Sequence, residues 1–287
     1  MIDADQRHGV RATALGLTCT AAKLCLDHRR SGHARILADA LAGTRADPKT
    51  LCSAATAEQL GPSARPLVLP WHKPITLGRV TLALTPSGAG VGTAAALVHT
   101  GVATVLDLRW ARPTPLWPFA PPEVPQAEVV ILDAGGVTGT TLAPDALYAA
   151  LQAAVDAGAQ TLAADDPVVA AALAAWLRAH GRGCAVSPRV AATLARWQRT
   201  GLAWPQSARR PAIRVSSTAE VAGADWRMAD AAFSRFARGA QVAELARLAG
   251  AREVLIVGQG ALALADQLLR LGIEACALRP QAQLPLV

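Results

Sequence analysis

The stretch from Pro74 to Val98 reads PITLGRVTLALTPSGAGVGTAAALV, and it decides the fold of the N-terminal half. β-Branched and apolar residues recur near a period of two over Thr76–Thr85, which predicts a strand. A glycine-rich run then interrupts the pattern. Apolar residues follow over Thr93–His99 and again over Val102–Leu108, with Thr100-Gly101 between them, and this arrangement predicts a hairpin.

The same region has the outline of a dinucleotide-binding fingerprint. A strand over Val80–Thr85 is followed by a glycine turn and later by the acidic residue Asp107. A parallel crossover, however, needs about a dozen residues including a helix, and Gly101 cuts short any helix that begins near Thr93. We therefore expect a glycine-rich hairpin here, and an ordinary strand-to-helix turn at the second glycine-lined helix start, Val257–Gly260.

Toward the C-terminus, strands alternate with helices. Proline at the first helical position and glycine just after the last turn mark several of the helix boundaries. The expected helices are Ala143–Ala157, Asp166–His180, Ser187–Gly201, Gln241–Ala249 and Ala261–Leu271, and the expected strands are Gln160–Ala164, Arg182–Val186, Arg252–Val257 and Ile273–Leu278. This alternation predicts a parallel sheet. The segment Pro205–Val221 breaks it, and we interpret this segment as the return path from an inserted subdomain.

Length and composition describe a globular protein with an aliphatic core. The chain has 287 residues, of which 52% are hydrophobic but only 4% aromatic, so it is long enough for one large α/β domain or two smaller ones. The five cysteines lie at scattered spacings without a CxxC pair, which indicates reduced, mostly buried thiols. The first residues lack the features of a signal peptide, and no apolar stretch reaches membrane-spanning length. We expect a cytoplasmic protein without a membrane partner.

The charge is basic, with 28 Lys+Arg against 21 Asp+Glu and a net charge of +7. Most of the basic residues are arginines, whose planar guanidinium groups suit phosphate recognition. Contact with a polyanion is one explanation of this excess. The arginine enrichment that accompanies GC-rich coding is the other, and charge alone leaves both open.

Several segments resemble the β-CASP metallo-β-lactamase-fold nucleases, nearest the bacterial ligase-associated DNA exonucleases, which are similar to mRNA 3′-end-processing factors. The family phrase Pro-x-Gly-His-x-x-Gly-Ser-Ala corresponds to Pro86–Ala94, PSGAGVGTA. Asp107–Pro115 resembles the segment that follows it, and Val129–Asp133 resembles the strand of the first β-CASP motif, which ends in an acid. The similarity is strongest over residues 66–135 and 236–279.

The resemblance implies an α/β fold, namely a metallo-β-lactamase-like αββα sandwich with a shortened β-CASP-like α/β insert. Residues 1–140 would form the N-terminal half of the sandwich. Residues 141–210 would form the insert, and residues 211–287 would complete the sandwich. Nucleases of this family hold two metal ions that bind the phosphodiester and activate a water molecule.

The metal-ligand positions of the family are occupied by small residues in this chain. The positions that the resemblance assigns to ligands are Ala38, Ala40, Gly43, Ala89, Gly239 and Gly258. Asp107, a candidate bridging carboxylate, and Asp133 are the acids that remain. Two isolated aspartates cannot hold a catalytic zinc pair, so we expect no metal and no other cofactor. His28 and His33 form a loose cluster with Asp27, which we interpret as a solvated loop.

The resemblance therefore predicts a pseudoenzyme that binds nucleic acid or assists an active nuclease or DNA ligase in DNA repair or RNA processing. The residues expected to contact nucleic acid are Arg109, Arg112, Arg209, Arg210 and Arg238. Arg238 stands beside the former metal site, where its charge can partly replace that of the ions toward phosphate.

Three alternatives stay open. One is a structural subunit anchored to a partner by Trp110, Trp117 and Phe119, although these aromatic residues can equally cap the core. Another is an enzyme that uses a nucleotide at the glycine turns. The last is a residual metal-dependent hydrolase.

Overall fold

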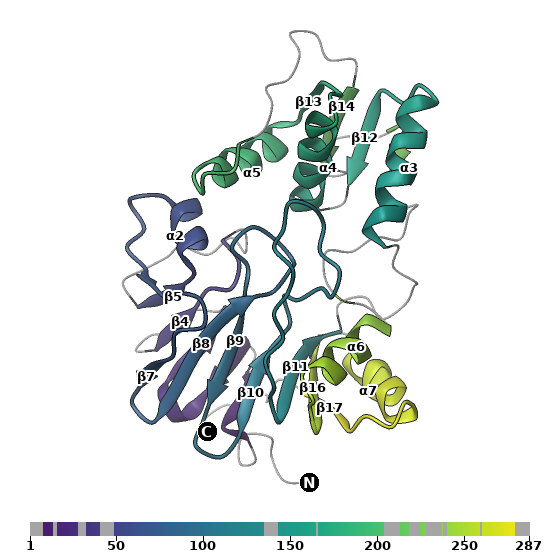
Figure 1. Cartoon of the computed structure of the whole chain (residues 1–287). Helices are drawn as coiled ribbons and strands as arrows, with labels where there is room; N and C mark the ends of the chain where they lie inside the picture. The colour runs from purple at the N-terminus through teal and green to yellow at the C-terminus, as the bar shows by residue number, and fades with distance from the viewer. Residues whose placement is uncertain are drawn as a thin grey trace, which may run out of the picture.

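The protein is a mixed α/β structure (Figure 1). The computed structural model describes residues 8–13, 16–27, 33–40, 49–134, 143–164, 166–203, 213–217, 224–227, 237, 240–258 and 260–278. In these residues the strands form three sheets, of six, seven and four strands. No helix among them is both long enough and apolar enough to cross a lipid bilayer.

The first sheet is formed by the N-terminal strands, which are ordered as they occur in the chain. They are β1 (Val10–Thr13), β2 (Gly16–Cys19), β3 (Leu24–Leu26), β4 (Ala34–Ile36), β5 (Thr50–Cys52) and β6 (Leu67–Val68). The pairs β1–β2 and β2–β3 are antiparallel, whereas the strands from β3 to β6 are parallel. A 3-10 turn (Thr20–Ala22) lies between β2 and β3, and helix α2 (Ala54–Leu60) follows β5.

The second sheet has the order β17-β16-β11-β10-β9-β8-β7. Its strands are β7 (Ile75–Leu77), β8 (Val80–Pro86), β9 (Ala94–His99), β10 (Thr104–Asp107), β11 (Val129–Asp133), β16 (Glu253–Val257) and β17 (Ala275–Ala277). The predicted hairpin is confirmed as the antiparallel pair β9–β10. The single strand predicted over Thr76–Thr85 is wrong, because Gly78 has a φ of +61° and turns the chain so that β7 pairs antiparallel with β8.

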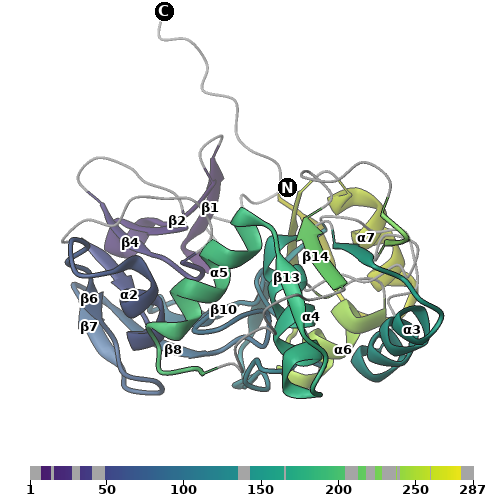
Figure 2. The same ribbon diagram turned by 90° about the horizontal axis from the view of Figure 1, so that it is seen from above.

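The two sheets pack face to face. One core cluster contains Leu24, Ile36 and Leu51 of the first sheet together with Leu82 and Ile131 of the second. Helices α6 (Ala240–Leu248) and α7 (Ala261–Arg270) pack against the other face of the second sheet and form a different core cluster with it. Figure 2 shows this layering from above, with the N-terminal strands on one side of the molecule and α7 on the other.

The third sheet belongs to a separate unit at the top of Figure 1. Its parallel strands have the order β13 (Cys184–Val186), β14 (Ile213–Ser217), β12 (Thr161–Ala164) and β15 (Trp226–Arg227). Helices α3 (Pro144–Asp156), α4 (Pro167–Ala179) and α5 (Pro188–Gln198) contribute to its own core, around Leu173 and Trp197. The prediction of a parallel sheet is confirmed here, and the Asp166 carboxylate caps α4 by accepting a hydrogen bond from the Val168 N–H at 2.8 Å.

Two sequence expectations are corrected in this region. Pro205–Val221 was interpreted as a return path, but it contains β14, which lies between β12 and β13 because its backbone pairs with both. Strand β15 also pairs with β12, so the third sheet extends to Arg227, past the boundary expected at residue 210. The N-terminal half also contains α2, a helix that the sequence patterns above do not predict and that begins after the N-cap residue Ser53.

Candidate functional site

Aspartates end three strands, or directly follow them, along one edge of the two facing sheets. Asp107 is the last residue of β10 and Asp133 the last of β11, while Asp27 comes directly after β3. Asp27 has a left-handed backbone with a φ of +65°, which aspartate tolerates better than most residues. Its N–H donates to the Ile36 carbonyl at 2.8 Å, and this bond holds the residue against β4.

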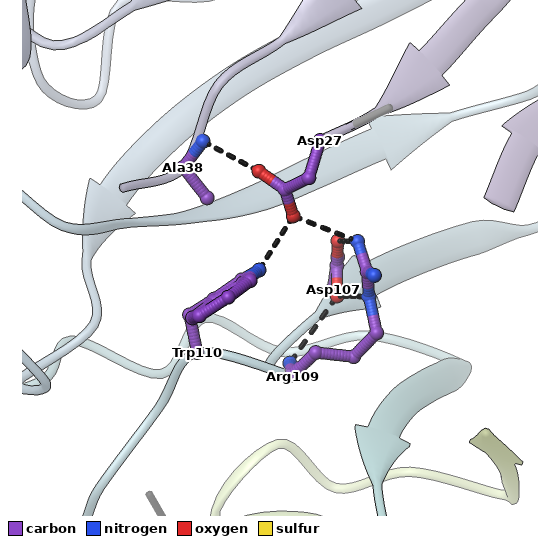
Figure 3. A network of polar contacts seen from close by, with 5 residues as sticks. All are labelled: Asp27, Ala38, Asp107, Arg109 and Trp110. Carbon is purple, nitrogen blue, oxygen red and sulfur yellow. Dashed lines mark hydrogen bonds and ion pairs between the residues drawn. The ribbon is translucent and has the colours of Figure 1, made fainter. Parts of the chain in front are cut away.

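Arg109 lies between the carboxylates of Asp27 and Asp107 (Figure 3). Its Nε donates to Oδ1 of Asp107 at 2.9 Å, and its Nη2 donates to Oδ2 of the same carboxylate at 2.8 Å. The Nη2 atom also donates to Oδ2 of Asp27 at 3.0 Å. The Arg109 side chain is only 11% exposed and that of Asp107 only 5%. Arg109 and Asp107 therefore form a nearly buried, bidentate ion pair, and Arg109 links this pair to Asp27.

The remaining contacts of Asp27 come from both sheets. The Ala38 N–H, just after β4, donates to Oδ1 at 2.8 Å, and the Trp110 indole N–H donates to Oδ2. The Ala38 carbonyl in turn accepts from the Ala94 N–H of the second sheet at 2.9 Å. Asp27 is therefore part of a buried network between the sheets, and the expectation that it belongs to a solvated loop is wrong.

Burial raises the pKa of the Asp27 carboxyl group above 3.8, and the neighbouring Asp107 raises it further. Arg109, the Ala38 N–H and the Trp110 indole act in the opposite direction but do not cancel the rise. For Arg109, burial lowers the pKa, whereas the charges of Asp107, Asp27 and Asp133 raise it, and the pKa ends above its ordinary value. The guanidinium group therefore stays charged at any physiological pH.

Three of the positions that the resemblance assigns to metal ligands, Ala38, Ala89 and Gly258, also lie at this edge. Ala38 follows β4, and Gly258 follows β16, beside the end of β11, where the Ala134 N–H donates to the Val257 carbonyl at 2.8 Å. Ala89 is fully buried in the loop between β8 and β9. This loop is at the same end of the sheet as Asp107, because Asp107 pairs with Ala96 near the start of β9. Ala40 is also buried.

Gly43, Gly239, Arg209, Arg210 and Arg238 lie outside the described residues. Ala237, the residue directly before Arg238, is described, and its N–H donates to the Ala111 carbonyl at 2.9 Å. That bond brings residue 237 close to the segment that carries Arg109 and Trp110.

The site does not fit the pair of metal ions that the resemblance implies. Both carboxylate oxygens of Asp107 already accept hydrogen bonds from Arg109. Ala38, Ala89 and Gly258 have no side-chain donor atom. Among the described residues, no group of three or more His, Cys, Asp or Glu side chains is arranged to hold a metal ion.

Two of the arginines predicted to contact nucleic acid are located in the interior. Arg112 is fully buried, and its Nε donates to the Thr114 carbonyl at 2.6 Å. Arg109 is engaged by the two carboxylates. Neither guanidinium group is presented on a surface that a nucleic acid reaches, so a role in binding would have to come from other residues.

The aromatic residues of the proline-rich loop between β10 and β11 (residues 108–128) divide between core and surface. Phe119 is buried and meets the Trp197 ring edge-on, with 5.5 Å between the ring centroids. The Tyr148 hydroxyl donates to the Trp117 carbonyl at 3.1 Å, while Trp117 as a whole is 43% exposed. Phe119 therefore caps the core of the unit that contains the third sheet, and it is not a surface anchor.

The glycine turn between β8 and β9 is explained by close packing. A Cβ atom on Gly92 would lie 2.8 Å from the Cβ of Ala55 and 2.9 Å from the backbone nitrogen of Thr56. One on Gly88 would lie 2.7 Å from the Arg112 carbonyl oxygen. The strands on either side are antiparallel neighbours, as expected for a hairpin and not for a dinucleotide-binding crossover.

A basic surface that the sequence reasoning missed lies on α5 and beside α2. Helix α5 carries arginines at positions 189 and 196, followed directly by Arg199, and has no acidic residue. The Arg199 Nη1 donates to the Gln59 carbonyl of α2 at 3.0 Å. Arg199 also lines an open depression of about 480 Å³ together with Glu58 and Arg65. The absence of acids between the arginines was the sequence signal for this surface.

Comparisons with known proteins assign no function to the chain. No family model matches it, and no curated protein sequence matches it. Among solved structures, a protein of unknown function from Enterococcus faecalis V583 aligns with a TM-score of 0.42 and 13% sequence identity. The alignment covers 85% of this chain and 68% of that chain. At this level of similarity the match carries no argument about fold or function.

Proposed function

We propose that the protein is a non-catalytic relative of the metal-dependent DNA and RNA exonucleases, and that it acts as a nucleic-acid-binding accessory subunit in DNA repair or RNA processing. The observation that carries this proposal is the state of the two acids at the strand ends. Asp107 and Asp27 are both engaged by Arg109, so the carboxylates that a hydrolytic metal site would need are already neutralised.

The arrangement of layers supports the finer fold assignment within this proposal. Two facing sheets, with α6 and α7 on the outer face of one of them, are the arrangement expected for most of a metallo-β-lactamase-like αββα sandwich. The unit around the third sheet lies in the chain between β11 and α6. A shortened β-CASP-like insert would occupy this position.

Helix α5 supplies the basic surface that nucleic-acid binding requires. Arg189 and Arg196 are two helical turns apart and so lie on the same side of the helix. An adjoining side of the helix buries Val190, Leu194 and Trp197 in the core. A rigid basic face of this kind binds phosphates through charge, without reading the sequence of bases.

The binding test measures affinity for single- and double-stranded DNA and RNA over a series of NaCl concentrations. We expect the logarithm of the affinity to fall linearly with the logarithm of the salt concentration. Arg189→Gln/Arg196→Gln should flatten that slope by about one to two units, because each phosphate contact contributes about 0.7–0.9. Arg79→Gln, in the exposed turn between β7 and β8, is the matched control and should leave the slope unchanged.

Hydrolysis is measured on the same nucleic acids with added Mn²⁺ or Zn²⁺, and we expect none. Binding that is absent or independent of salt would refute the nucleic-acid role. Metal-dependent cleavage that disappears in Asp107→Asn would refute the non-catalytic assignment.

A second candidate, a subunit that acts by protein contact alone, is favoured by exposed leucines at the end of α6 and along and just after α7. Leu248, Leu262, Leu269 and Leu271 are each about half exposed. Co-purification with a nuclease or a DNA ligase, lost in Leu262→Asp/Leu269→Asp but kept in the α5 variant, would favour this candidate. Co-purification that is lost in the α5 variant but kept in Leu262→Asp/Leu269→Asp would favour nucleic-acid binding.

A further inference from the structure

The carboxylate–guanidinium network joins the two facing sheets. Asp27 belongs to the edge of the first sheet, whereas Asp107 and Arg109 belong to the edge of the second. The 3.0 Å bond from Arg109 to Asp27 therefore crosses from one sheet to the other. Two nearly buried carboxylates so close to each other need a cation between them, because each would otherwise be a charge without compensation in a medium of low polarity.

The hydrogen-bond geometry suits a planar guanidinium group. Two nitrogens of Arg109 contact the two oxygens of Asp107 side by side, and one of them also reaches Asp27. The Asp27 carboxylate accepts two further hydrogen bonds, from the Ala38 N–H and the Trp110 indole N–H. A divalent ion at the same place would find two carboxylates, but it usually needs a larger set of converging donors.

We infer that the guanidinium group of Arg109 is the resident cation of this site. It neutralises Asp27 and Asp107 and locks the two sheets together at the edge where the resemblance places metal ions. The site is therefore built for a planar organic cation and not for a metal. This inference does not depend on nucleic-acid binding, and its test involves no nucleic acid.

Chemical rescue tests the inference directly. Arg109→Ala removes a group with the shape of ethylguanidinium, and we expect its melting temperature to fall on the order of 10 °C below that of the wild type. Millimolar ethylguanidinium should restore a large part of this loss. Ethylammonium, which has the charge without the planar donors, should restore less, and Mn²⁺ or Zn²⁺ should restore little. Arg79→Ala, in an exposed turn, is the control and should respond to none of these cations.

The identity of the rescuing cation decides the outcome. Rescue by Mn²⁺ or Zn²⁺ but not by ethylguanidinium would show that the acids still form a metal site, and it would overturn the inference. A melting temperature of Arg109→Ala equal to that of the wild type would overturn it as well.

A double-mutant cycle keeps the test decisive if Arg109→Ala does not fold. The variants are Asp107→Asn, Arg109→Met and the double variant, in which both charges are removed. We expect the double variant to melt at or above the temperature of the Arg109→Met variant, because no carboxylate of Asp107 is then left without its cation. If the losses of melting temperature of the two single variants add up in the double variant, Asp107 and Arg109 do not interact, and the inference is contradicted.

Discussion

At Asp27, burial opposes the negative charge of the carboxylate. Its side chain is 12% exposed, and its carboxylate lies close to that of Asp107. Three donors, from Arg109, Ala38 and Trp110, stabilise the ionised form. Their combined effect is smaller than that of burial and the Asp107 charge together, and the pKa of Asp27 remains above 3.8.

The raised pKa of Asp27 predicts a specific dependence of stability on pH. The folded protein binds a proton at Asp27 more tightly than the unfolded chain does, so the stability that Asp27 contributes is complete below its unfolded-state pKa and is lost as pH rises through its folded-state pKa. Asparagine does not titrate. The free energy of unfolding of Asp27→Asn minus that of the wild type should therefore increase with pH from the unfolded-state pKa of Asp27 up to its folded-state pKa.

Urea unfolding at a series of pH values from about 3 to about 7 measures this difference. Asp156→Asn is the control, because Asp156 is 54% exposed in its ion pair with Arg182. A difference that decreases with pH for Asp27→Asn would mean that the hydrogen bonds outweigh burial and that the pKa is lowered in the folded state.

Sequence patterns located part of this site. The resemblance predicted Asp133 at the end of a strand, and the apolar run Val102–Leu108 predicted the strand that contains Asp107. Asp27 follows only Leu24-Cys25-Leu26, a run too short to predict a strand. The burial of Arg109 depends on Asp27, which is far away in the sequence, and no local pattern contains that information. An arginine two residues after a buried acid therefore looked like a surface group.

At the scale of elements, the start of α2 is joined to the glycine turn between β8 and β9. The Ser53 Oγ accepts from the Thr56 N–H at 3.1 Å and donates to the Gly92 carbonyl at 2.7 Å. The Thr56 hydroxyl donates to the same carbonyl at 2.9 Å. Gly92 approaches the helix closely because it has no side chain. One buried serine therefore both caps a helix and fixes a loop beside the site.

Ser53→Ala should lower the free energy of unfolding by about 1–2 kcal/mol, because it removes an N-cap and leaves the Thr56 N–H without this acceptor. Guanidinium unfolding measures the change. Ser63→Ala, at an exposed position just after α2, should change stability by less than about 0.5 kcal/mol. Equal effects of the two substitutions would show that the cap contributes no stability.

The boundaries of elements could be predicted where local chemistry marks them. The starts of α3, α4 and α5 were predicted to within about one residue, since each has proline at its first position. Helix α2 was missed because it is short and has no such proline. Strand β14 was missed because it lies among serines, arginines and prolines. Its pairing with β12 and β13 is a tertiary effect.

At the scale of the whole molecule, separate hydrophobic cores stabilise the third-sheet unit and the two facing sheets. Leu173 is buried in the core of the unit, and Leu255 is buried between the facing sheets. The alternation of strands and helices predicted a parallel sheet for the C-terminal half. It did not predict that β16 and β17 join the second sheet while β12–β15 form another, because strand order depends on contacts between distant segments.

These separate cores predict that the unit around the third sheet opens independently of the facing sheets. Leu173→Ala should cost about 2–5 kcal/mol, because it leaves a cavity in a packed core, and it should lower amide hydrogen-exchange protection in α4, β12 and β14. Protection in β8–β11 should stay unchanged. Leu255→Ala is the reciprocal variant and should lower protection in β8–β11 and β16 while the third sheet keeps its own. If either substitution lowered protection equally in both regions, the molecule would unfold as one cooperative unit. The ion network of Arg109 would then stabilise the third sheet as strongly as the two facing sheets that it joins.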